Sequence, residues 1–376
     1  MSELASETAA LQRWLFDDAL ALWWTVGADR ERGGFHDAIE LTGVPSARPR
    51  RARSITRMVF SYAEAGRLGW GGPWREAAGH ALAYLRKHFV TADATVASIV
   101  DVDGHTREAP FDLYDQAFAL LAFASAERVF GETSGGRASA VALRTTLERH
   151  YAHPLGGFFE DRDQRLPQRS NPHMHVLEAA LAWLALDTAP GWRQLADGIA
   201  ALARDKFIDP ASGALREFFD AEWRPAAGLD GRVCEPGHQY EWAFLLARWA
   251  ALTGRPRPAV VERLIAFADR HGLDTERGVA IGSVLSDGTR HDPVARLWAQ
   301  AERIRAYRIE RRPGDDVARA IRGLRRFLAT PKAGLWFDQL TRDNRLIPEP
   351  ARATSLYHIV GAVAELSRCG SESARR

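Results

Sequence analysis

The distribution of apolar and polar residues predicts two kinds of helical segment, which alternate along the chain. In the first kind nearly every position is apolar, as in residues 113–130, and a helix that is apolar almost all round is buried on most sides. Residues 176–186, 242–252 and 359–366 share this character. We expect these segments to be inner helices of the fold.

Segments of the second kind carry one apolar stripe and charged residues elsewhere, which is typical of helices that cover a core from outside. They alternate with the inner segments at 73–89, 138–151, 192–207, 258–271 and 315–328, and residues 6–26 have the same character. The pattern therefore predicts an outer ring of helices around an inner ring.

Turns rich in Gly and aromatic residues separate the units, 56 to 65 residues apart. Their centres lie near Gly34, Ala97, Gly157, Gly213, Gly278 and Gly334. A fixed period indicates one supersecondary unit that is repeated. Six units predict an all-α toroid of helical hairpins, with short β-hairpins at its rim. Since no linker or low-complexity stretch interrupts the repeat, we expect one domain over residues 1–376.

A reactive side chain follows each turn, at the start of the inner segment. In chain order these are Arg57, Tyr114, His175, His238, Glu302 and His358. The same position in each repeat faces the same place in the assembled protein, so these side chains are predicted to converge on one polar pocket. A pocket of this kind is the layout of an active site.

The charge balance and the cysteine content of the chain argue against some classes of function. Fifty Lys and Arg balance 48 Asp and Glu to leave a formal charge of +2, so no overall field favours nucleic acid or an anionic membrane. The two cysteines, Cys234 and Cys369, are far apart and form no CxxC motif. With no apolar signal core at the start of the chain and no membrane-spanning run, we expect a cytoplasmic protein.

The local cluster Arg48–Arg53 is interpreted as a solvated loop or a rim on the substrate side, and alternatively as a contact for an acidic partner.

The sequence Glu235-Pro-Gly-His-Gln-Tyr-Glu-Trp242 carries the strongest local signal for chemistry. His238 and Glu241 are three apart on one helical face, where a carboxylate would favour the imidazolium and orient it for proton transfer. A capped helix start with a buried structural pair explains the same residues equally well.

Other candidate site residues are selected because of their position in the repeat, and their neighbouring residues alone would not indicate a function. Asn171 and His175 share a helical face, whereas His173 does not share it with His175. A lone histidine on an apolar helix is more often a core residue, and Ser355–His358 alone reads as a cap region. Trp298 and Glu302, four apart, offer an aromatic face and a carboxylate, which suit a sugar ring.

The histidines could also supply a metal site, but no HExxH motif or tight carboxylate cluster supports one, so we expect no metal and no other cofactor.

Together these motifs resemble the N-acylglucosamine 2-epimerase family, which includes cellobiose 2-epimerases and mannose isomerases. The resemblance covers essentially the whole chain and is carried by Arg57, Asn171–His175, Glu235–Trp242, Trp298–Glu302 and Tyr357–His358. It implies an (α/α)6 barrel. Where many members have Gln, this chain reads Ser54-Ile55-Thr56, so the role assigned to Arg57 could belong to Arg53.

The resemblance also implies proton transfer at the sugar carbon next to the carbonyl. His238 and His358 would be the general acid/base pair and His175 would assist ring opening. The resemblance gives Arg57 and Glu241 the task of orienting and polarising the substrate. The pocket would be lined by Tyr114, Asn171, Trp298, Glu302 and Arg53.

We therefore expect a metal-free isomerase that interconverts a mannose-type aldose and a fructose-type ketose through a cis-enediolate. The alternative within this chemistry is a sugar 2-epimerase. A glycoside hydrolase on the same barrel, and a sugar-binding or scaffold protein without turnover, are alternatives of other classes. The expected partner is a monosaccharide, and the expected state is a monomer or homodimer.

Overall fold

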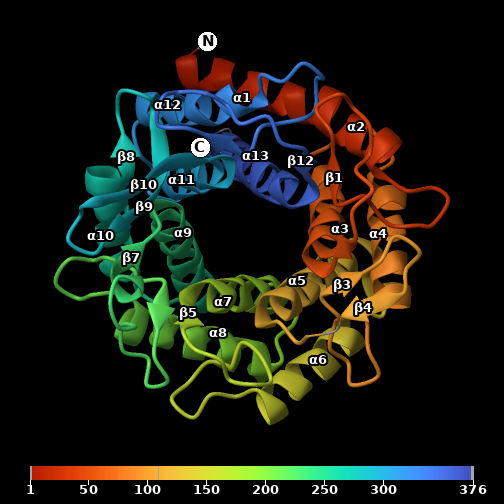
Figure 1. The fold of residues 1–376 in the computed structure, drawn as a ribbon, viewed down its shortest axis with the longest axis horizontal. Coiled ribbons are helices and arrows are strands. Elements are labelled where there is room, and N and C mark those ends of the chain that lie inside the picture. Colours follow the sequence, from red (N-terminus) through yellow and green to blue (C-terminus); the bar gives the residue numbers. More distant parts are fainter. Residues whose placement is uncertain (1, 109, 374–376) are drawn as a thin grey trace.

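The computed structural model describes residues 2–108 and 110–373, with side chains over 2–105 and 110–368. Six helices form a closed inner ring, because each contacts the next and the last contacts the first (Figure 1). They are α3 (Ala52–Arg67), α5 (Leu113–Phe130), α7 (Ser170–Leu184), α9 (Pro236–Thr253), α11 (Leu297–Ile309) and α13 (Ala353–Ser373). The inner segments read from the sequence all lie in this ring.

An outer ring surrounds the inner one and lies against it (Figure 1). It consists of α1 (Glu3–Arg13) with α2 (Leu20–Leu22), α4 (Trp74–His88), α6 (Gly136–His150), α8 (Pro190–Leu202), α10 (Val260–Phe267) and α12 (Gly314–Arg325). Short π-helical turns extend several of these helices, at Trp14–Ala19, Trp23–Gly27, Ala203–Phe207 and Ala268–Gly272. The (α/α)6 barrel expected from the repeat is thus confirmed.

Short strands lie where the chain enters the inner helices. β2 (Arg50–Arg51), β5 (Gln168–Arg169), β7 (Val233–Cys234), β10 (Arg290–Arg296) and β12 (Ala351–Arg352) each end directly before an inner helix or one residue earlier. Their partners are β1 (Ala38–Ile39), β3 (Ile99–Val100), β6 (Phe218–Phe219), β9 (Val279–Leu285) and β11 (Gln339–Leu340). Two further strands extend these sheets, because β4 (Thr106–Glu108) pairs with β3 and β8 (Leu273–Asp274) pairs with β9. Most are two-residue strands, as predicted, but β9 and β10 form a longer hairpin of seven residues each. Since the strands lead into the helices, the N-termini of the inner helices share this rim.

Backbone hydrogen bonds connect neighbouring units at the same rim. The first amide of α3 donates to Ser98 O at 2.9 Å, and the first amide of α13 donates to Asp37 O at 2.9 Å, which joins the last unit to the first. Corresponding bonds run from Leu113 to Glu160, from Ser170 to Glu217 and from Leu297 to Asp338. Because these bonds fix where each inner helix begins, they also fix the height at which its first side chains enter the barrel.

The inner helices are buried nearly all round, as their apolar sequences require. On α5, fourteen of its residues are buried, from Leu113 to Glu127. Between the rings, apolar and aromatic side chains pack closely; Trp183 of α7, for example, stacks on Trp192 of α8 with ring centroids 5.2 Å apart. Within the described residues, no helix combines the length and the apolar character that crossing a membrane requires.

Candidate active site

A cavity of about 240 Å³ opens at the rim where the inner helices begin. Nine of the ten side chains selected from the sequence line it: Arg53, Arg57, Tyr114, Asn171, His175, His238, Glu241, Trp298 and His358. They come from all six inner helices, so the common position in the repeat does bring these groups together. The exception is Glu302.

Glu302 was expected to line the pocket, and the structure corrects this placement. Its side chain is fully buried, lies one helical turn deeper than Trp298, and bonds His358 instead of facing the cavity. Oε1 of Glu302 accepts a hydrogen bond from Nδ1 of His358 at 2.7 Å. This bond directs the other ring nitrogen of His358 away from Glu302. Burial, reinforced by the positive charges of Arg57 and Arg305, lowers the pKa of His358 well below its usual value, so His358 is neutral.

His238 is in the opposite protonation state. Its Nδ1 donates to Oε2 of Glu217 at 2.9 Å, and a carboxylate oxygen of Glu235 is 3.8 Å from the same nitrogen. Burial lowers the pKa of His238, but the charges of Glu217 and Glu235 outweigh it and raise the pKa to about 10. The cavity therefore holds an imidazolium at His238 and a neutral imidazole at His358.

The carboxylate that orients His238 is not the one expected. Glu241 was paired with His238 because the two share a helical face, but the ring nitrogen nearest to Glu241 is Nδ1 of His175, at 3.9 Å. Oε1 of Glu241 is buried and accepts no hydrogen bond from the described side chains. Burial and the nearby charges of Glu302 and Glu178 raise the pKa of Glu241 well above its usual value. A protonated Glu241 can donate a hydrogen bond to a substrate oxygen.

His175 is held by Glu178, one turn further along α7. Nδ1 of His175 lies 3.2 Å from Oε2 of Glu178, while burial lowers the pKa of His175 to about 4. The guanidinium of Arg305 bridges the two orienting carboxylates, at 2.8 Å from Glu302 and 3.3 Å from Glu178. One buried cation thus connects the supports of His175 and His358.

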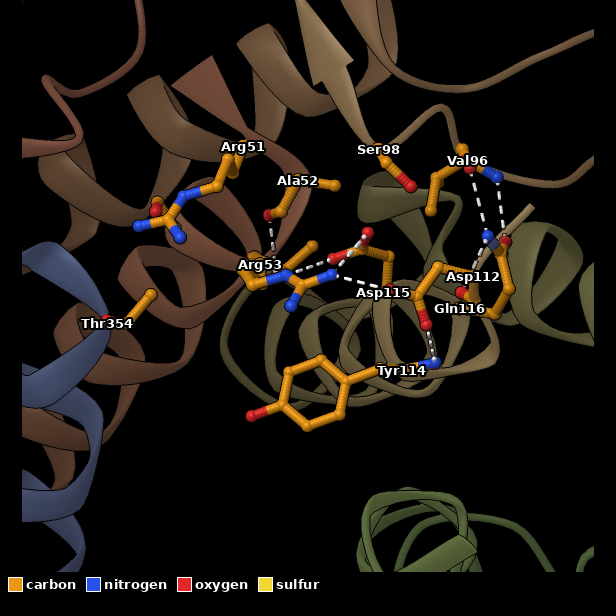
Figure 2. A network of polar contacts seen from close by, with 12 residues as sticks. Arg51, Ala52, Arg53, Val96, Ser98, Asp112, Tyr114, Asp115, Gln116 and Thr354 are labelled. Carbon is orange, nitrogen blue, oxygen red and sulfur yellow. Dashed lines mark hydrogen bonds and ion pairs between the residues drawn. The ribbon is translucent and has the colours of Figure 1, made fainter. Parts of the chain in front are cut away.

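Arg57 and Arg53 have different hydrogen-bond partners, and Figure 2 shows those of Arg53. Arg53 forms hydrogen-bonded ion pairs with Asp112 at 2.7 Å and with Asp115 at 2.8 Å. Among the described residues Arg57 bonds only neutral groups, since it donates to the hydroxyl of Tyr114 at 2.6 Å and to Thr354 O at 3.1 Å. Its positive charge is therefore not neutralised by a bound carboxylate, which suits stabilisation of a negative oxygen on a substrate.

Trp298 forms an aromatic wall between the two histidines. Its ring centroid lies 4.8 Å from that of His238 and 5.8 Å from that of His358. Gly237 makes this position possible, because a Cβ there would come within 2.4 Å of the Trp298 ring. The glycine of the Glu235–Trp242 motif is thus explained by the close approach of an aromatic side chain from α11.

His173 lies outside the cavity, as its position relative to His175 predicted. Its Nε2 accepts a hydrogen bond from the amide of Phe158 at 3.1 Å, and its ring packs on Trp223. His173 is therefore a core histidine that fixes the turn of its own unit.

The sequence analysis missed Glu217 and Glu178. Glu217 occupies the position of its turn at which other units carry Asp37, Glu160 and Asp338, each of which contacts the start of an inner helix. An alignment of the repeats would have found it. Glu178 carries no repeat signal, since it is one carboxylate on an otherwise apolar helix.

The folded chain also brings His and Glu side chains into groups that the separated sequence positions did not suggest. Among the described side chains, three groups have potential ligand atoms within 4.8 Å of one another: His175 with Glu178 and Glu241, His238 with Glu217 and Glu235, and His358 with Glu241 and Glu302. In each group a carboxylate already accepts the hydrogen bond of the imidazole Nδ1. These bonds suit acid/base histidines with fixed tautomers.

Comparison with known proteins finds similar proteins over most of the chain. A model of the N-acylglucosamine 2-epimerase family matches residues 33–362. A Rhizobium meliloti protein named mannose-6-phosphate isomerase is 42% identical over 96% of this chain and 97% of its own length. A cellobiose 2-epimerase of Bacteroides fragilis is 26% identical over 79% and 80% of the two chains. The crystal structure of a sugar epimerase from a ruminal bacterium shares the fold, with a TM-score of 0.86 and 18% identity over 96% of this chain and 98% of that one.

Proposed function

Because the chain belongs to the N-acylglucosamine 2-epimerase family, whose members isomerise or epimerise sugars, we propose that it interconverts a mannose-type aldose and the corresponding fructose-type ketose. Membership of an isomerase family removes the glycoside hydrolase and scaffold alternatives. The name of the Rhizobium meliloti relative supports isomerisation and a mannose-type substrate.

One observation carries the proposal. His238 and His358 line the same cavity, each close to the ring of Trp298, with the pKa of His238 raised and that of His358 lowered. Two titratable groups whose pKa values are moved in opposite directions are suited to serve as acid and base in one reaction. Aldose–ketose isomerisation needs such a pair.

In the proposed reaction, neutral His358 removes the proton from C2 of the open-chain aldose. The C–H electrons form the C1–C2 double bond, and the carbonyl electrons move to O1, which accepts a proton from the imidazolium of His238. Arg57 stabilises the negative charge that develops on the oxygens of the enediolate. His358 then returns its proton to C1 while His238 recovers one from O2, which yields the ketose with both histidines in their initial states.

Two further side chains have supporting tasks in this proposal. Protonated Glu241 donates a hydrogen bond to a sugar hydroxyl, and His175 contacts the ring oxygen or a neighbouring hydroxyl during ring opening. Tyr114, Asn171 and Trp298 line the walls that hold the sugar chain. Arg53, held by two aspartates, shapes the wall beside Tyr114.

A 2-epimerase is the second candidate. The observation that favours it is that two histidines, both close to the Trp298 ring, line one cavity, so a second imidazole is available to return a proton to the other face of C2. The enediolate is common to both reactions, and only the position of the returning proton differs.

The proposal is tested by incubating the purified protein with D-mannose in D2O after chelation and dialysis, and by resolving the products chromatographically. Fructose carrying deuterium supports the isomerase, and glucose with deuterium at C2 supports the epimerase. Absence of both products, together with no deuterium in recovered mannose, would refute the proton-transfer mechanism. Activity that appears only when a divalent metal is added back would overturn the metal-free part.

A further inference from the structure

Several inner helices have an arginine as the residue directly before their first residue, at the rim of the barrel. Arg51, Arg296 and Arg352 each stand directly before such a helix, at the ends of β2, β10 and β12. All three line the same cavity as the histidines. The helices that they precede, α3, α11 and α13, are neighbours in the closed ring, because α13 contacts both α11 and α3, so the arginines form a cationic arc on one side of the mouth.

The arginines of this arc are neutralised to different degrees. Arg51 is paired with Asp37 at 2.8 Å, and Arg352 with Glu349 at 3.1 Å. Arg296 is exposed and has no carboxylate within ion-pair distance among the described side chains. Its guanidinium is therefore available to an anion that enters the cavity.

Backbone register brings Arg296 and Arg352 toward each other. Arg296 is directly opposite Gln339 on β11, and the amide of Gln339 bonds Glu349, which is also the partner of Arg352. Asp338 lines the same cavity as the two arginines, and one of its oxygens accepts a hydrogen bond from the hydroxyl of Ser355. Burial raises the pKa of Asp338, while the charges of Arg352 and Arg296 oppose this effect.

We propose that Arg296 and Arg352, with Arg51 beside them, bind the phosphoryl group of a hexose phosphate whose reacting carbons lie between His238 and His358. This inference rests on the proposed isomerisation and names its substrate class. Guanidinium groups match tetrahedral oxyanions through paired N–H donors, and two or three of them suit the charge of a phosphate monoester. The basic cluster noted in the sequence is thus assigned in part to substrate recognition through Arg51.

The position of the arc agrees with this assignment. Arg57, the other cavity arginine without a carboxylate partner, lies deeper and bonds Tyr114 and Thr354. Arg296 is at the exposed rim. An open-chain sugar phosphate would thus place its enediolate oxygens near Arg57 and its phosphoryl group at the mouth.

The test compares kcat/KM for D-mannose 6-phosphate and for D-mannose. In the native protein the phosphorylated sugar is expected to be preferred. In Arg296→Gln, and more strongly in Arg296→Gln/Arg352→Gln, the ratio of the two kcat/KM values should fall about tenfold or more, as expected when a charged hydrogen bond is removed. Arg290→Gln, on the same strand but outside the cavity, should leave the ratio unchanged.

A binding measurement separates this inference from the catalytic proposal. Calorimetry with mannitol 1-phosphate and with mannitol, which have no carbonyl group to isomerise, should show tighter binding of the phosphorylated polyol and loss of that difference in Arg296→Gln. This result would support the subsite even if no sugar were turned over. Equal binding of the two polyols, or an unchanged difference in Arg296→Gln, would overturn it even if D-mannose were isomerised. A preference for a 6-sulfonate over the phosphate would likewise overturn the assignment to phosphate.

Discussion

Glu217 holds the imidazole of His238 at 2.9 Å although 21 residues separate the two in the chain. The carboxylate is itself fixed, because it accepts bonds from the hydroxyl of Ser170 at 3.3 Å and from the amide of Glu235 at 3.2 Å. Glu217 therefore acts at a junction of two units, where it sets both the orientation and the charge of the proposed general acid.

The pH dependence of turnover should follow from the two histidines. His358 must be neutral, and since its pKa is lowered below the usual 6.5, activity should decline only in acid solution. His238 must be protonated, and since its pKa is raised to about 10, activity should decline only in strongly alkaline solution. We therefore expect a broad plateau of kcat/KM around neutral pH. An alkaline decline that begins near pH 6.5 would contradict the assignment of His238 as the acid.

Glu217→Gln should move the alkaline limb of this profile to lower pH. The amide keeps a hydrogen-bond acceptor but removes the charge that raises the pKa of His238, so the imidazolium is lost earlier as pH rises. The effect should appear in kcat more than in KM, because Glu217 does not line the cavity. Glu222→Gln is a matched control, since Glu222 is exposed and pairs with Arg224. An unchanged alkaline limb in Glu217→Gln would refute the role of this carboxylate.

Removal of either histidine should abolish most turnover while leaving the barrel folded. General acid/base groups contribute about 10²–10⁴-fold each. His238→Ala and His358→Ala should therefore lose activity within that range, and His358→Ala should also lose the exchange of the C2 proton with D2O. His291→Ala, at an exposed position of β10, is the control. Retained exchange in His358→Ala would transfer the role of base to another residue.

The ring of helices could be predicted from the sequence because its signal is repeated. Six turns at a similar spacing, and inner helices as apolar as residues 113–130, leave few ways to bury the chain. The same repeat placed His175, His238 and His358 in one cavity. Helix ends were less well predicted: the inner segment read at 176–186 is the helix Ser170–Leu184, since its first polar turn carries no apolar periodicity.

The partners of the histidines could not be predicted in the same way. Proximity on one helix suggested Glu241 for His238, whereas the fold supplies Glu217 from the turn that precedes the helix. Contacts between a turn and a helix depend on how the chain folds back at the rim, and helical spacing does not contain this information. Arg305 shows the same limit, because its bridge to Glu178 connects side chains 127 positions apart.

Arg57 and Arg53 should respond differently to substitution. Arg57→Lys retains a charge but loses the planar donor pair, and removal of one oxyanion donor reduces kcat about 10²–10³-fold. Arg53→Lys retains attraction to Asp112 and Asp115 and should change kcat much less, with KM as the affected parameter. Steady-state kinetics of both variants with the same sugar decide between them. A larger loss of kcat in Arg53→Lys would assign the oxyanion role to Arg53.

Arg305 should matter for stability as well as for catalysis. Its side chain is 5% exposed and lies between the carboxylates of Glu178 and Glu302, so Arg305→Met leaves two buried acids facing each other. Loss of one partner from such a group costs about 3–5 kcal/mol, and urea unfolding at pH 7 should show a decrease of this size.

The pH dependence of that loss separates electrostatics from packing. Although burial raises the pKa of Glu178, its bond to His175 and the charge of Arg305 outweigh this effect and lower the pKa to about 2. A lowered carboxyl pKa stabilises the fold above the unfolded value of 4.5, and this contribution disappears as pH falls toward 2. The difference between Arg305→Met and the native protein should therefore shrink as pH falls from about 4.5 toward 2. Arg325→Gln, which removes a surface pair with Glu7, should cost no more than about 1 kcal/mol. A loss in Arg305→Met that does not change with pH would mean that Arg305 stabilises the barrel by packing and not by its charge.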